Sequence, residues 1–166
     1  EDIIRFAPTL EQWFEGGEFL VVGAPAPVAG GAAQLGTGAD VVGSAGGDGG
    51  AVGARGCDDG FGAAWAAWKK FGKSGVYLNV NHGDPYPKEQ EGNNVYWMDF
   101  CYPVEQTKEI LKKANSIQLI DHHKTAKEPA KLLENPVLDM EHSGAVLAWK
   151  FFHPKIKVPR LLSYIE

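Results

Sequence analysis

The chain has 166 residues, of which 44% are hydrophobic and 22% charged, and its formal net charge is -5. This composition indicates one globular domain and excludes a fibrous, collagen-like or wholly disordered protein. The two cysteines form no C-x-x-C pair, which argues against a disulfide framework or a cysteine zinc site and favours a cytoplasmic location. The longest uncharged run, Phe19 to Ala39, is rich in Gly and Pro and predicts no membrane span. The negative charge disfavours binding of long duplex nucleic acid.

Charge and glycine divide the chain into two regions. Residues 1–68 contain two basic and nine acidic residues, and fifteen of the twenty-one glycines lie between Gly16 and Gly60. The run from Gly43 to Gly50 loses much conformational entropy on ordering and has little to bury, so we expect a flexible loop or disorder there. We therefore predict a poorly ordered Gly-rich segment over residues 1–55 and a folded domain over residues 56–166.

Secondary-structure signals are sparse at first and then alternate between strand and helix. A short helix around Leu10 to Phe14 and a strand from Phe19 to Val22 are expected in the first region. Later, short apolar runs predict strands and helical spacing predicts helices. We expect strands at 76–80, 95–98 and 116–120. We expect a helix at 61–71 that ends at Gly72, a second helix that Pro103 opens, and a third at 144–152 with Ser143 as its cap. This alternation predicts an α/β fold, a parallel sheet flanked by helices, with the site at the carboxyl ends of the strands.

Polar side chains follow each of these strands. His82 and Asp84 follow the first, Asp99 follows the second, and the run Asp121-His-His123 closes the third. Carboxylates and imidazoles that meet at one sheet edge are ligands for divalent cations such as Mn²⁺ or Mg²⁺. Two such cations generate a hydroxide nucleophile and stabilise the charge on a phosphoryl group in transit. The sequence therefore predicts phosphoester hydrolysis.

Five motifs resemble those of the DHH phosphoesterase superfamily, in family order from Cys57 to Glu166. They are Cys57-Asp-Asp-Gly-Phe-Gly-Ala-Ala64, Asn81-His-Gly-Asp-Pro85, Met98-Asp-Phe-Cys-Tyr-Pro103, Leu119-Ile-Asp-His-His-Lys-Thr-Ala126 and Asp139-Met-Glu-His-Ser-Gly-Ala145. The similarity is greatest to the oligoribonuclease and cyclic nucleotide phosphodiesterase branch. The resemblance implies a Rossmann-like DHH catalytic domain, incomplete at its C-terminus, with manganese as cofactor.

The resemblance also implies roles for individual residues. Asp58, Asp59, Asp99 and His122 would hold a pair of Mn²⁺ ions, with Mg²⁺ as the other candidate, and Asp99 would bridge them. His123 would contact the substrate phosphate, and Asp121 would orient the loop. Lys124, next to the Asp121-His-His123 motif, is the best lysine candidate for a phosphate contact. The expected catalytic residues are Asp99, His122 and His123.

Two features depart from the family pattern. The family has a histidine shortly before the acidic pair, and residues 51–56 contain none. The family also continues beyond the position of Glu166, into a further metal-binding aspartate and a smaller substrate-binding domain. Because the match stops abruptly upstream of Cys57, we hypothesise that residues 1–55 are a foreign or mistranslated extension. An unbroken reading frame in resequenced DNA, with no family-like reading nearby, would contradict this.

Simpler interpretations remain open for several of these residues. Asp58-Asp-Gly60 alone is typical of a turn, and Asp121-His-His123 alone could cap a helix. His82 and Asp84 could be ordinary loop residues or replace the absent ligand. Gly36-Thr-Gly38 lacks the third glycine of a dinucleotide site. The favoured function is hydrolysis of phosphodiester bonds in short oligonucleotides or cyclic nucleotides; the alternatives are a pyrophosphatase or polyphosphatase and a catalytically impaired domain that binds nucleotides or a partner chain.

Overall fold

The computed structural model describes residues 18–23, 40–42, 58–80, 82–83 and 85–166. Its strands are β1 (Glu18–Gly23), β2 (Asp40–Val42), β3 (Gly75–Val80), β4 (Asn94–Met98), β5 (Ser116–Asp121) and β6 (Val137–Leu138). Its α-helices are α2 (Asp58–Phe71), α3 (Val104–Leu111), α4 (Lys127–Ala130), α5 (Gly144–Phe152) and α6 (Arg160–Ile165). Its short 3-10 helices are η1 (Gly72–Ser74), η2 (Lys88–Gln90) and η3 (Lys124–Ala126).

The described strands form one sheet in the order β1-β3-β2-β4-β5-β6. Strands β4, β5 and β6 are parallel, with Met98 opposite Ile120 and Ile120 opposite Val137, and β2 is parallel to β3 and β4. This agrees with the expected parallel sheet, whereas β1 pairs antiparallel with β3. An antiparallel neighbour needs no crossover helix, so helix and strand alternation in the sequence does not reveal it.

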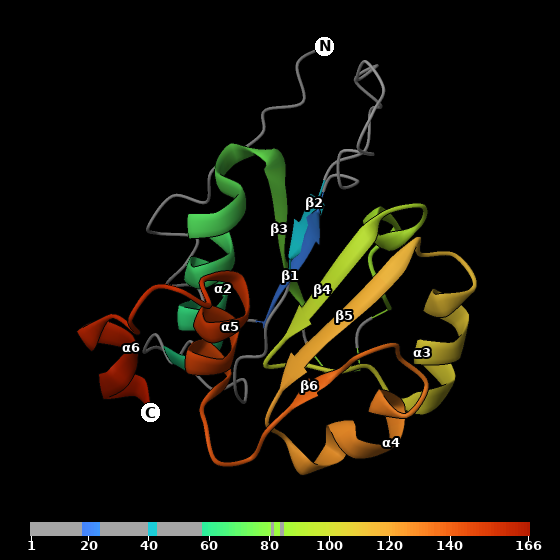
Figure 1. Ribbon diagram of the computed structural model, residues 1–166. Helices are drawn as coiled ribbons and strands as arrows, with labels where there is room; N and C mark the ends of the chain where they lie inside the picture. The colour runs from blue at the N-terminus through green and yellow to red at the C-terminus, as the bar shows by residue number, and fades with distance from the viewer. Residues whose placement is uncertain (1–17, 24–39, 43–57, 81, 84) are drawn as a thin grey trace, which may run out of the picture.

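Helices cover both faces of the sheet (Figure 1): α2, α5 and α6 lie on one side and α3 and α4 on the other. Side chains alternate between these faces along each strand. In β4, Val95 and Trp97 enter the core under α3 and α4, while Tyr96 and Met98 face the core under α2 and α5. This alternation lets a five-residue strand support two hydrophobic cores.

The helices α2 and α5 pack closely because the residues between them are small. The buried residues of α2 are all glycine or alanine: Gly60, Gly62, Ala63, Ala64, Ala66 and Ala67. A Cβ atom on Gly62 would lie only 2.6 Å from the Cβ of Ala145 in α5. Beyond this contact, the rings of Trp65 and Trp149 stack with their centroids 5.2 Å apart. The close approach brings the N-termini of both helices to the same edge of the sheet.

The core under α3 and α4 is instead filled by large aromatic side chains. Trp97, Phe100 and Tyr102 are at most 2% exposed. Trp97 Nε1 donates a hydrogen bond to Gln90 Oε1 at 2.9 Å, and Gln90 Nε2 lies 3.4 Å from the Tyr102 hydroxyl oxygen that accepts from it. The fully buried Gln90 amide therefore has partners on both of its polar atoms, as burial requires.

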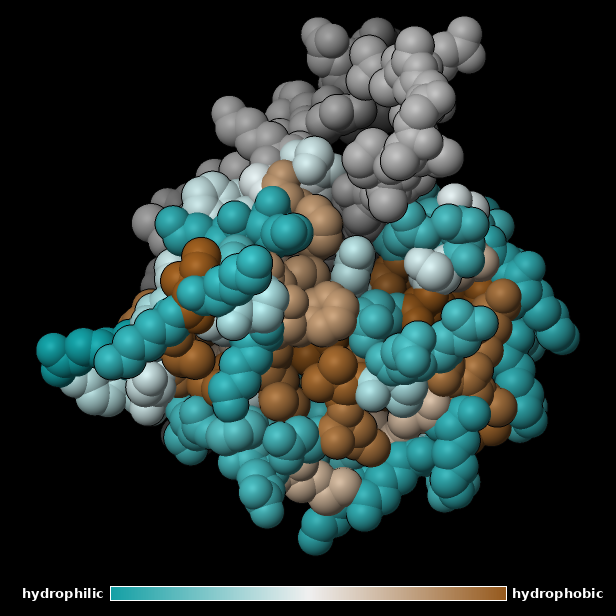
Figure 2. Space-filling model, viewed as in Figure 1, coloured by the Kyte–Doolittle hydropathy of each residue, from teal (hydrophilic) through white to brown (hydrophobic). Residues whose placement is uncertain are grey.

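The helix α6 closes the layer formed by α2 and α5. Its Leu162 is fully buried near Gly62, whereas Leu161 and Tyr164 stay more than half exposed. His142, just before α5, contacts the carboxylate of Glu166 through its Nδ1 atom. On the other side of the same imidazole ring, His142 Nε2 lies 2.8 Å from Lys150 Nζ. Figure 2 shows apolar residues reaching the surface among hydrophilic ones on this face of the molecule. Polar contacts therefore hold the last helix on α5 beside its buried leucine.

Most of the expected elements in residues 58–166 are confirmed. The strands at 76–80, 95–98 and 116–120 match β3, β4 and β5, and α5 spans 144–152, with the Ser143 hydroxyl accepting a hydrogen bond from Val146 N at 3.2 Å. The expected start of the first helix at Phe61 is wrong, because α2 begins at Asp58. The strands β2 and β6 and the helices α4 and α6 were not predicted, since two to six residues carry little periodicity.

Several expectations concern residues outside the described ranges. They are the short helix at Leu10 to Phe14, the loop from Gly43 to Gly50 and the glycines at Gly36 and Gly38. The strand expected at Phe19 to Val22 lies within β1. In the part of the chain that the structure describes, no helix has the length and apolar character needed to cross a membrane.

Candidate metal centre

Asp99 lies directly after β4 and is almost completely buried. Its backbone N–H donates to Ile120 O at 2.9 Å, which extends the β4–β5 ladder by one residue. Its φ of 56° then places it in the left-handed region, which aspartate adopts more readily than most residues but which still has an energetic cost. The chain therefore turns sharply at the sheet edge, and the Asp99 side chain is left 1% exposed.

The last residue of β5, Asp121, organises the loop that follows. Its Oδ1 accepts hydrogen bonds from the backbone N–H of His122 at 2.7 Å and of His123 at 3.0 Å. The same oxygen lies 2.8 Å from Nδ1 of the His123 ring. One carboxylate oxygen thus fixes the backbone of both histidines and the orientation of one imidazole. This geometry matches the loop-orienting role expected for Asp121.

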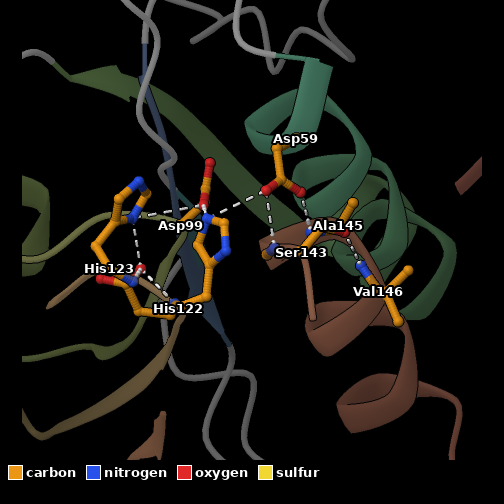
Figure 3. A network of polar contacts seen from close by, with 9 residues as sticks. Asp59, Asp99, His122, His123, Ser143, Ala145 and Val146 are labelled. Carbon is orange, nitrogen blue, oxygen red and sulfur yellow. Dashed lines mark hydrogen bonds and ion pairs between the residues drawn. The ribbon is translucent and has the colours of Figure 1, made fainter. Parts of the chain in front are cut away.

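Side chains from three elements converge at this edge (Figure 3). His122 Nε2 lies 3.0 Å from Asp99 Oδ1 and 3.3 Å from Asp59 Oδ2. His123 Nδ1 lies 3.7 Å from the same Asp99 oxygen. One candidate ligand atom from each of Asp99, His122 and His123 lies within 4.8 Å of the others. The sheet edge therefore gathers carboxylates and imidazoles that are up to 64 positions apart in the sequence.

Asp59 reaches this group from the first turn of α2 and also caps α5. Its Oδ2 accepts from Gly144 N at 2.9 Å and its Oδ1 accepts from Ala145 N at 2.5 Å. A carboxylate at a helix N-terminus satisfies N–H groups that have no partner within the helix and interacts favourably with the helix dipole. Asp59 therefore links the first turn of α2 to the first turn of α5.

The charges of the site shift the protonation of its members. Burial raises the pKa of Asp99 to about 6, and the nearby Asp59 carboxylate adds to this, while the hydrogen bond from His122 opposes it. The hydrogen bond to Asp99 raises the pKa of His122. The hydrogen bond to Asp121 raises the pKa of His123 to about 9. Without a cation, the site therefore retains protons at neutral pH, and a bound cation would displace some of them.

The expected site residues differ in where the structure places them. Asp59, Asp99, His122 and His123 come together. Asp58 is exposed at the start of α2 and lies outside the Asp99-His122-His123 group. Lys124, the first residue of η3, is exposed next to His123. Among the other candidates, the exposed His82 has its ring 5.0 Å from that of Phe100, and Asp84 lies outside the described residues.

Two residues at the start of α5 belong to the site and were not predicted as members. Gly144 and Ala145 donate their backbone N–H groups to Asp59, and a Cβ on Gly144 would lie 2.6 Å from Asp99 Oδ1. The sequence signal was the cap residue Ser143, which correctly marks the start of α5. No local pattern identifies an acceptor 85 positions away.

The donor set fits a divalent cation. Carboxylate oxygen and imidazole nitrogen together suit Mn²⁺ and other borderline cations, whereas Mg²⁺ prefers oxygen alone. Asp99, His122 and His123 could hold one ion, and Asp59 Oδ2 lies close enough to His122 to join them after a small movement. Within the described residues, this group accounts for the ligands of one ion and leaves those of a second unassigned.

Comparisons with known proteins place the chain in no characterised group. No family model matches it, and no solved structure does either. It is 28% identical over 128 residues to an uncharacterized protein, R106, of Acanthamoeba polyphaga mimivirus. The match covers 66% of this chain, which spans about 30% of the length of that relative. The name of the relative states no activity.

Proposed function

We propose that the chain is part of a metal-dependent phosphoesterase that hydrolyses phosphodiester bonds in short oligonucleotides or cyclic nucleotides. One observation supports this above the others: beside the carboxyl ends of the parallel strands β4 and β5, His122 Nε2 lies 3.0 Å from Asp99 Oδ1 and 3.3 Å from Asp59 Oδ2. Ligand sites occur preferentially at this edge in α/β proteins. The DHH-like motifs favour the same function, carried by a Rossmann-like DHH catalytic domain.

Asp99 and His122 are the proposed principal ligands. Asp99 is buried and fixed at the end of β4, and His122 is oriented by its backbone contact with Asp121. Asp59 is the proposed third ligand, since Oδ2 lies 3.3 Å from His122 Nε2 as well as accepting from Gly144 N, while Oδ1 accepts from Ala145 N. A bound divalent cation would activate water near neutral pH and neutralise charge on the phosphoryl group. Mn²⁺ is the proposed cation, and the resemblance to the DHH superfamily implies two such ions.

His123 is the proposed contact to the substrate phosphate. Its pKa of about 9 keeps the ring positively charged at neutral pH, and nearly half of the side chain is exposed. Asp121 holds the ring through Nδ1, which leaves Nε2 free of that contact and able to donate to a phosphate oxygen. The exposed Lys124 beside it would add positive charge for the same anion.

Calorimetric titration with Mn²⁺ tests this proposal at its first step. We expect saturable binding by the native chain and a loss of at least about tenfold in affinity for Asp99→Asn, which removes the buried charge at nearly constant volume. Asp58→Asn is the matched control, because Asp58 is exposed on the same helical turn, and it should bind within about twofold of native. Absence of saturable binding by the native chain would contradict the proposal.

Activity assays then separate the substrate classes. A short RNA, a cyclic dinucleotide and pyrophosphate should each be offered to this chain in the presence of Mn²⁺. Turnover of the first two, lost in His122→Asn, would support a phosphodiesterase. Turnover of pyrophosphate alone would support the pyrophosphatase alternative. His123→Gln should raise KM more than it lowers kcat, since its proposed role is phosphate binding.

A second candidate function is binding without catalysis. The observation that favours it is the use of both Asp59 oxygens by the backbone N–H groups of Gly144 and Ala145. If Asp59 keeps both hydrogen bonds to α5, it is not available as a metal ligand. The remaining ligands would then be too few for catalysis, and the domain would only bind a nucleotide or a partner chain. Saturable nucleotide binding with no Mn²⁺ binding and no turnover would select this function.

A further inference from the structure

The first residue of α5, Gly144, contacts both acids that flank the proposed cation. Its backbone N–H donates to Asp59 Oδ2 at 2.9 Å. From its other side, a Cβ built at this position would lie 2.6 Å from Asp99 Oδ1 and 2.8 Å from both Asp99 Cβ and Cγ. We propose that Gly144 is a positioning residue whose lack of a side chain sets the location of the Asp99 carboxylate relative to His122 and Asp59. This inference rests on the proposed function.

Neither partner in the Gly144–Asp99 contact can easily move away. The backbone of Asp99 is held by its hydrogen bond to Ile120 O and by the turn that its φ of 56° imposes. Gly144 is held by Asp59 and by the Ser143 cap, whose hydroxyl accepts from Val146 N. A contact of 2.6 Å is shorter than any Cβ makes in a relaxed structure, so a side chain at 144 would displace the Asp99 carboxylate.

Displacement of Asp99 would act directly on the ligand geometry. The Asp99 Oδ1 that a Cβ at 144 would crowd is the oxygen that lies 3.0 Å from His122 Nε2 and 3.7 Å from His123 Nδ1. Cation affinity depends on ligands held within a fraction of an ångström of the required positions. Substitution of Gly144 should therefore weaken cation binding beyond its effect on folding.

Gly62 provides a matched control for crowding alone. A Cβ on Gly62 would also meet its nearest atom at 2.6 Å, but that atom is the Cβ of Ala145, and the next contacts are apolar atoms of Leu162 and Ile165. The same substitution to alanine therefore creates similar crowding between α2, α5 and α6 without touching the principal ligands Asp99 and His122; it meets the site only at Ala145, which donates to Asp59.

The first experiment compares Gly144→Ala and Gly62→Ala by Mn²⁺ calorimetry at a temperature where both variants are folded. We expect Gly144→Ala to lower Mn²⁺ affinity at least about tenfold and Gly62→Ala to leave it within about twofold of native, although both should lower the melting temperature by about 5 °C. Equal affinity of Gly144→Ala and native protein would overturn the inference and leave the proposed function standing. If the native protein itself bound no Mn²⁺, the proposed function would fail, and with it the inference.

The second experiment uses the metal-free protein and a double-mutant cycle with Asp99→Gly. Asp99→Gly removes all three atoms that a Cβ at 144 would meet, and glycine tolerates the positive φ. In that background, Gly144→Ala should no longer lower the melting temperature, because the crowding partner is gone. The same loss in both backgrounds would overturn the inference. If Gly144→Ala alone does not fold, rescue by Asp99→Gly would support it and failure to rescue would contradict it.

Discussion

The two helical layers of the protein pack against the same sheet in opposite ways. Under α2 and α5, glycine and alanine let backbones approach until Gly62 has no room for a Cβ. Under α3 and α4, Trp97, Phe100 and Tyr102 fill the space with aromatic rings. In the first layer the N-terminus of α5 lies against Asp59, whose carboxylate accepts from the N–H groups of Gly144 and Ala145.

The difference shows that bulky side chains can stabilise one face of a sheet while closely packed helices on the other face position a candidate site at the sheet edge. Bulky side chains bury more apolar surface and contribute more to the free energy of unfolding. Helices that pack closely through glycine and alanine bury less apolar surface per residue. Their short separation lets a carboxylate side chain on one helix reach the backbone N–H groups of the other. The four predictions below test this comparison, from the largest expected effect to the smallest.

Truncation of the aromatic layer should have the largest effect on stability. Trp97→Ala removes a fully buried indole and leaves Gln90 Oε1 without its donor, so we expect a loss of about 4 kcal/mol in the free energy of unfolding, measured by urea denaturation. Trp65→Ala, on the partly exposed stack with Trp149, should cost about half as much. Equal losses would show that the two layers contribute alike.

Removal of the carboxylate that links α2 to α5 should have the next largest effect. Asp59→Ala deletes the acceptor of two backbone N–H groups, and we expect a loss of about 2 kcal/mol with faster hydrogen exchange at Gly144 and Ala145. The exposed neighbour Asp58 offers the control, and Asp58→Ala should change stability by no more than about 0.5 kcal/mol. Protection of both amides in Asp59→Ala would argue that α5 is held by packing alone.

Loss of the local cap of α5 should have a smaller effect than loss of Asp59. Ser143→Ala removes the hydroxyl that accepts from Val146 N, and we expect a cost of about 1 kcal/mol by thermal or urea unfolding. Ser143→Thr keeps the acceptor and should restore most of this stability. A larger loss for Ser143→Ala than for Asp59→Ala would reverse the proposed order of the two contacts.

The smallest expected effect is the contribution of His123 to the pH dependence of the metal-free protein. The pKa of His123 is raised from 6.5 to about 9, so its contribution to stability is complete below pH 6.5 and is lost as the pH rises through about 9. The pKa of Asp99 is raised from 3.8 to about 6, which lowers stability as the pH rises through about 6. Because the His123 ring is half exposed, its share should stay below about 1 kcal/mol.

A comparison of native protein with His123→Gln measures this share. Between pH 6.5 and pH 9.5 the native protein should lose more stability than the variant, and the difference isolates His123 from other groups that titrate there. Identical slopes for the two proteins would contradict the pairing of His123 with Asp121. The affinity for Mn²⁺ should have the opposite pH dependence and increase at higher pH, because the ligands release protons when the ion binds.

The parts of the fold that the sequence predicted are those with a strong local signal. The strands β3, β4 and β5 are short apolar runs that end at polar residues, and α5 has an apolar face and a serine cap. The short elements β6 and α4 have too few residues for a period to show. The same strand-end pattern placed Asp99 and the histidines at one edge, as the structure does.

Other parts of the site needed contacts that no local pattern contains. Asp58 and Asp59 are adjacent and chemically identical, yet Asp59 faces His122 and α5 while Asp58 is exposed, because helical geometry turns successive side chains to different faces. The left-handed conformation of Asp99 and the need for glycine at 144 likewise depend on neighbours distant in sequence.

The sequence by itself determined which residue types stand at the ends of the central strands, because apolar runs and the polar residues that follow them are encoded locally. Only the tertiary structure decided how these groups meet: the close α2–α5 contact brings Asp59 to the first turn of α5, and that turn sets the space available to Asp99. The physical reason is that backbone proximity depends on the size of side chains from both helices at once, which neither segment specifies alone.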